Sequence, residues 1–75
     1  MNSTKNIYRL MFGVAHDYHV FESDDLERMK QRFNGVVQWC KAEMLPWRIA
    51  LYKSSYGSGY AEEIRFIQLT EKDFK

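Results

Sequence analysis

The sequence predicts a single α+β domain over residues 1–75, in which two β-hairpins flank one helix in the order β-β-α-β-β. Short alternating segments stand on both sides of a long segment whose apolar residues recur every three or four positions. A four-stranded, mostly antiparallel sheet with the helix packed on one face satisfies this pattern most simply. We expect residues 1–5 and 72–75 to be frayed.

The first hairpin is predicted from residues 7–14 and 18–21, which are rich in aromatic and aliphatic side chains on either side of a polar break. Gly13, inside the strand pattern, predicts a bulge or the close approach of another backbone. The alternation in residues 18–21 does not assign the register of the second strand. In the first strand, a period of two places one set on the core face: Tyr8, Leu10, Phe12 and Val14.

A helix is predicted over residues 23–44. Ser23 or Asp24 is expected to cap its N-terminus, and Pro46 ends it near residues 43–45. Gly35 costs about 1 kcal/mol relative to alanine, which close packing at that position would offset. The apolar residues at helical spacing predict a core-facing stripe: Leu26, Met29, Phe33, Val36, Val37, Cys40 and Met44. Burial in this stripe would raise the pKa of the Cys40 thiol and make it unreactive.

The second hairpin is predicted from residues 47–52 and 63–70, joined by a turn with two glycines. The last strand carries apolar residues in both registers, and one helix covers only one face of a sheet. We therefore expect a protein partner or a second copy of the chain, in a homodimer, to cover the other face. That face is expected to receive some of five residues: Met11, Tyr52, Tyr60, Ile67 and Leu69.

Charge and cysteine content exclude several broad classes. Eleven Lys and Arg residues against ten Asp and Glu residues give a formal charge of +1, so no global field selects nucleic acid or an anionic membrane. No apolar run is long enough for a membrane span or a signal peptide. Cys40 is the only cysteine, which is typical of a reducing compartment. We expect a cytoplasmic protein that does not bind membranes.

No group of residues forms a catalytic signature. His16 and His19 flank a turn, but two imidazoles without a third ligand make a weak metal site. Glu62 and Glu63 are expected to face solvent at the start of a strand rather than to act as an acid/base pair. We expect a protein that is not an enzyme, with no catalytic residue, no metal and no cofactor.

One line of residues beside the helical stripe is the first candidate binding site: Arg28, Arg32, Gly35 and Trp39. Tryptophan and arginine are enriched at binding hot spots, and a glycine between them permits close approach by a partner. The competing interpretation makes Trp39 a structural residue, folded over the sheet edge with an arginine stacked on it. The binding interpretation predicts a small adaptor or inhibitor that occupies a surface of a larger protein. Phage- and plasmid-encoded accessory proteins are commonly of this size, which is an analogy of size alone.

The second hairpin provides an alternative site, for single-stranded nucleic acid. Aromatic side chains that stack on bases and cations that contact phosphates are the chemistry such a ligand needs. The neighbouring Glu62 and Glu63 cancel much of the local positive charge. The residues of this alternative are Arg48, Tyr52, Lys53, Tyr56, Tyr60 and Arg65.

Overall fold

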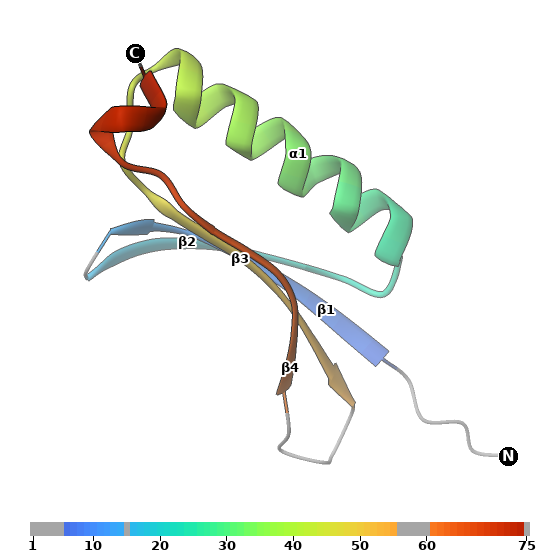
Figure 1. The fold of residues 1–75 in the computed structure, drawn as a ribbon. Coiled ribbons are helices and arrows are strands. Elements are labelled where there is room, and N and C mark those ends of the chain that lie inside the picture. The colour runs from blue at the N-terminus through green and yellow to red at the C-terminus, as the bar shows by residue number, and fades with distance from the viewer. Residues whose placement is uncertain (1–5, 15, 56–60, 75) are drawn as a thin grey trace, which may run out of the picture.

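The computed structural model describes residues 6–14, 16–55 and 61–74 (Figure 1). Its elements are β1 (Asn6–Val14), β2 (Asp17–Ser23), α1 (Leu26–Ala42), β3 (Arg48–Ser55), β4 (Ala61–Gln68) and a 3-10 helix, η1 (Glu71–Phe74). The strands form one sheet in the order β2-β1-β3-β4, with every neighbouring pair antiparallel. Helix α1 lies across one face of this sheet (Figure 1). The predicted α+β fold and its β-β-α-β-β order are confirmed.

The core lies between α1 and the inner strands of the sheet. Strand β1 contributes Tyr8, Leu10 and Phe12, as the alternation predicts, while Val14 pairs with Asp17 beside the turn and is exposed. The helix contributes four residues of the predicted stripe, and β3 and the segment after β4 complete the cluster. These further buried residues are Met29, Phe33, Val37, Cys40, Ile49, Leu51 and Leu69.

The two ends of the chain stand differently. Phe74 of η1 packs partly against the core, and η1 overlaps the 72–75 segment that the sequence predicts to be frayed. Residues 1–5 lie outside the described part of the chain. No helix among the described residues combines the length and the apolar character that a membrane span needs.

A β-bulge in β4 corrects the expected facing of the last strand. Between the pairs Leu51↔Arg65 and Tyr52↔Glu63, β3 advances by one residue and β4 by two, so Ile64 is the additional residue. Strict alternation fails at this point. Ile64 and Ile67 both pack against the core, and Leu69 is buried there. Ile67 and Leu69, two of the five residues from which the uncovered face was expected to receive some, therefore lie on the helix side, and Phe66 lies on the uncovered face.

The helix begins one residue later than the caps predicted for it. Asp25, rather than Ser23 or Asp24, is the N-cap, and its Oδ1 accepts a hydrogen bond of 3.1 Å from the Arg28 backbone N–H. The Ser23 hydroxyl accepts instead from the Asp25 backbone N–H. Because α1 starts at Leu26, the N-cap position immediately before it is occupied by Asp25.

Met44 is not part of the core stripe, in contrast to the prediction. It follows the C-cap in a left-handed conformation with φ of 56° and is 65% exposed. The Leu45 N–H donates to the Cys40 carbonyl and the Met44 N–H to the Lys41 carbonyl, which together form a Schellman motif. The motif needs a left-handed residue after the C-cap, and this forces Met44 away from the core.

The close approach of another backbone segment, predicted at Gly13, is confirmed. The φ of Gly13 is 148°, and a Cβ atom placed there would lie 2.2 Å from the Asp17 backbone carbonyl oxygen. Only glycine fits at this point of the β1–β2 hairpin.

Replacing Met44 by glycine is expected to raise the free energy of unfolding by about 1 kcal/mol, because it relieves left-handed strain at an exposed side chain. Urea denaturation measures the change. Glu43→Gly is the matched control, since Glu43 has a φ of −90° and gains nothing from glycine. Equal or lower stability of Met44→Gly than of the wild type would contradict this account.

Burial raises the pKa of the Cys40 thiol, because desolvation disfavours the thiolate. In the unfolded chain this thiol loses its proton above about pH 8.5, whereas in the folded chain it keeps the proton to a higher pH. The free energy of unfolding is therefore highest below the unfolded pKa and falls as the pH rises through the folded pKa. Urea denaturation at about pH 7 and about pH 10 should show a larger fall in the free energy of unfolding for the wild type than for Cys40→Ala. Parallel pH profiles for the two proteins would show that the thiol does not contribute.

Candidate protein-binding site

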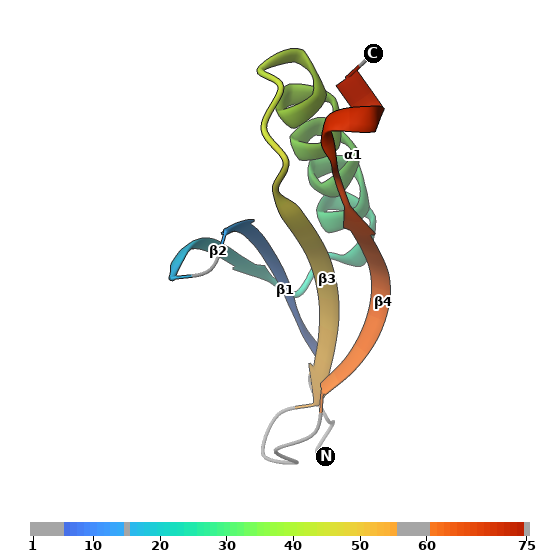
Figure 2. The same cartoon turned by 60° about the vertical axis from the view of Figure 1, so that its left-hand side comes forward.

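Helix α1 leaves the edge strand β2 uncovered. The pairs Phe12↔His19 and Leu10↔Phe21 place His19 and Phe21 on the helix side of the sheet, which settles the register that the sequence left open. The helix packs on β1 and β3, and the β1–β2 hairpin projects out to one side of it (Figure 2). Phe21 is consequently 40% exposed although it faces the same side as the core.

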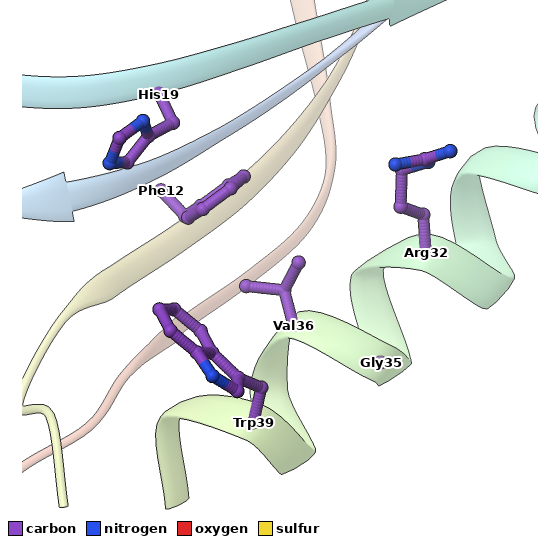
Figure 3. Close-up of a pocket in the computed structure, with 6 residues that line it drawn as sticks. All are labelled: Phe12, His19, Arg32, Gly35, Val36 and Trp39. Atoms are coloured by element: carbon purple, nitrogen blue, oxygen red, sulfur yellow. The ribbon is translucent and has the colours of Figure 1, made fainter. Parts of the chain in front are cut away.

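A groove of about 410 Å³ runs between this hairpin and α1 (Figure 3). Its surface is almost entirely apolar, and its volume falls in the range of about 300 to 1,000 Å³ that is usual for ligand sites. The groove has two walls and is otherwise open to solvent. Strands β1 and β2 provide one wall and the helix provides the other. The lining residues are Phe12, His19, Arg32, Gly35, Val36 and Trp39.

Aromatic rings form a continuous surface along and beneath the groove. The Phe12 ring centre lies 5.2 Å from that of His19 and 5.6 Å from that of Phe21. Trp47, in the connection after the helix, stacks 6.2 Å from Phe12 and 6.0 Å from His19. Trp39 meets Trp47 edge to face at 5.5 Å. Contacts of this kind hold each ring in place, so the surface is preorganised.

Two arginines stand at one end of the groove. The Arg32 guanidinium carbon lies 4.7 Å above the centre of the Phe21 ring, in a cation–π contact. Arg28 borders a neighbouring depression that Phe21 and Arg32 also line. The ion pairs found within the described residues are Arg9–Glu22 and Lys30–Glu27, and neither involves these two arginines. The apolar groove thus ends beside two arginines that take part in neither of these ion pairs, although Glu22, the partner of Arg9, also lines the depression.

Gly35 faces open space, and the close packing that would offset its cost to the helix is not supplied by the described part of the chain. A Cβ atom at Gly35 would meet nothing within 4 Å. Trp39 is 48% exposed, with one edge against Trp47. The arginine stacking expected on Trp39 occurs on Phe21 instead, through Arg32. Trp39 therefore presents about half of its surface to solvent beside an unfilled site.

The structure brings three of the four predicted partner-binding residues into one groove, namely Arg32, Gly35 and Trp39, and places Arg28 in the adjoining depression. His19 also forms a wall of this site, which the sequence pattern did not predict. The pairing of Val14 with Asp17 sets the register of β2 and so fixes the facing of His19.

The residues of the nucleic-acid alternative do not share one surface. Strand alternation places Arg48 and Tyr52 on the face opposite the helix, and Lys53 on the helix side with Leu51. Arg65 also lies on the helix side, where its Nη1 donates a 3.3 Å hydrogen bond to Asn34 Oδ1. Tyr56 and Tyr60 lie outside the described residues.

The uncovered sheet face carries one apolar row across all four strands. Cross-strand register aligns Val20, Met11, Ala50 and Phe66 in that order. The Arg48 guanidinium carbon lies 5.6 Å from the centre of the Phe66 ring. This face holds the row that a homodimer of the predicted kind would use. A depression of about 220 Å³ lies at its edge, lined in part by Gly13, Tyr18 and Arg48.

Comparison with protein-family models, with curated proteins and with solved structures finds no match to this chain. Among the described residues, no three His, Cys, Asp or Glu side chains lie together in a way that would hold a metal ion. The groove is the feature from which function is inferred.

Replacing Gly35 by alanine is expected to raise the free energy of unfolding by about 1 kcal/mol, because it adds helix propensity without a clash. Gln38→Ala, at another exposed position of α1, serves as the control and should change stability by about 0.5 kcal/mol or less. The measurement is urea denaturation. A neutral or destabilising Gly35→Ala substitution would mean that the space at Gly35 is not open.

Proposed function

We propose that this chain is a small, non-enzymatic binding module that attaches to a larger protein through the groove between β2 and α1. The observation that carries the proposal is that three residues line one groove. Trp39 is half-exposed, Arg32 has no ion-pair partner among the described residues, and Gly35 faces open space in the middle of the helix. Tryptophan and arginine beside a preorganised apolar surface are the composition of a binding hot spot.

The shape of the groove favours a protein over a small molecule as its occupant. Small-molecule sites bury about 70 to 90% of the ligand surface in an enclosed cleft. This groove has walls on the hairpin side and the helix side and is otherwise open. A side chain presented by a partner surface would fill the groove, while the rest of the partner would cover its open side. An adaptor or an inhibitor would act in this way.

The test is affinity capture from extract of the host cell, with mass spectrometry of the captured proteins. The Arg32→Ala/Trp39→Ala double variant is expected to lose the partner, with a weakening of about thirtyfold or more, because a single hot-spot truncation is worth about 2 kcal/mol. Lys41→Ala is the matched control, because it removes one positive charge from the opposite flank of the same helix. It should retain the partner.

Loss of the fold is separated from loss of the site by a third variant, Gly35→Gln. Glutamine is a good helix former, so this variant should be at least as stable as the wild type while placing a side chain at the groove. Circular dichroism monitors the fold of all variants. If the double variant and Gly35→Gln captured the same partner as well as the wild type does, the groove would not be the binding site.

A further inference from the structure

Strand β2 is an open sheet edge of a kind that folded proteins usually protect. It is the outer strand of the sheet, and no described residue pairs with its far side. An unprotected edge is a template for another strand, and proteins commonly block such edges with lysine, proline or a bulge. The sequence of β2, Asp17–Ser23, contains neither lysine nor proline, and its pairing with β1 runs without a bulge.

The opposite edge of the same sheet is protected. Strand β4 carries Glu62, Glu63 and Arg65 and is interrupted by the bulge at Ile64. These are devices that discourage edge-to-edge pairing. Strand β2 also carries charge, at Asp17 and Glu22, so the bulge is what distinguishes the two edges and makes β2 the place where a further strand can be added.

The groove lies on the helix side of this open edge. A strand added to β2 would run about 4.8 Å beyond it, and every second side chain of that strand would point to the helix side. Figure 3 shows that His19 lines the β2 side of the groove, and the side chain next to His19 would stand at this margin of the groove. The next side chain on the same face, about 7 Å along the strand, would stand beside Phe21, below the two arginines.

The charges at the groove determine what these two side chains should be. The surface around His19 is apolar and aromatic, which suits a large apolar side chain. Arg28 and Arg32 stand at the Phe21 end, outside the ion pairs of the described residues, which suits a carboxylate. The large apolar side chain and the carboxylate would therefore be two residues apart on one added strand.

We propose, as an extension that rests on the proposed function, that the partner binds by strand addition. An extended segment of the partner adds to β2 as a fifth strand, with a large apolar side chain in the groove. An Asp or Glu two residues away pairs with Arg28 and Arg32. Main-chain hydrogen bonds along β2 supply affinity, and the two side chains supply specificity.

The test begins with a displayed library of linear peptides about twelve residues long, selected against the full chain. The expected result is enrichment of peptides with an Asp or Glu two positions from a Phe, Trp, Leu or Met. Arg28→Glu/Arg32→Glu should bind the best peptide about tenfold more weakly or worse, and a peptide with lysine in place of its acid should recover binding to that variant. Lys41→Glu should leave the affinity within about threefold of the wild type.

Backbone methylation separates strand addition from recognition of side chains alone. N-methylation of successive peptide residues should weaken binding at alternate positions only, because every second N–H of an added strand faces β2. Hydrogen exchange should show slower exchange of β2 amides in the complex. Enriched peptides without the acidic and apolar spacing, methylation effects without alternation, or failure to enrich any peptide would each overturn the proposal.

Two outcomes distinguish this inference from the proposed function. If the groove variants lose a protein partner while the methylation pattern does not alternate, the binding module stands and strand addition is wrong. If light scattering shows that the free chain is a dimer and β2 amides are protected in it, the edge belongs to a second copy, and strand addition by a partner is likewise overturned.

Discussion

The width of one helix is the constraint on which the rest of this structure depends. A helix with its side chains is about 10 Å across, whereas four strands spaced about 4.8 Å apart present a wider face. Helix α1 packs over β1 and β3, where Leu10 and Leu51 meet its apolar stripe. One strand at the margin of the sheet must therefore stay uncovered by the helix. Here it is β2, and the groove, the exposed rings and the open edge all follow from that position.

The two flanks of α1 meet the sheet differently. On the β4 side, Arg65 reaches Asn34 and the ring of Phe33, and the bulge at Ile64 turns an additional apolar side chain inward, so this side is closed. On the β2 side, Arg32 crosses the gap to Phe21, and Trp39 reaches His19 only through Trp47. The helix therefore packs closely against the sheet along its β4 flank and leaves an open groove along its β2 flank.

The sequence predicted what local periodicity determines and missed what depends on pairing between distant segments. The order of elements, the core stripe through Phe33 and Cys40, and the separate flank with Arg32 and Trp39 all follow from spacing along the chain. The facing of β2 depends on its pairing with β1, and the inward facing of Ile64, opposite to that of Phe66, depends on a bulge that no alternation reveals. His19 could be recognised as part of the site only after β2 was placed.

The central position of β1 has a consequence for how the chain folds. Its pairing with β2 is local, but its pairing with β3 joins Leu10 to Leu51 across the whole helix. An isolated two-stranded hairpin is marginal in water, and closing the long connection is slow relative to forming turns. Trp47, which stacks on Phe12 and His19 beneath the groove, directly precedes β3, so the aromatic surface is complete only when β3 has paired with β1. A partner that recognises the groove would select fully folded chains and pass over intermediates in which the hairpin and the helix have formed separately.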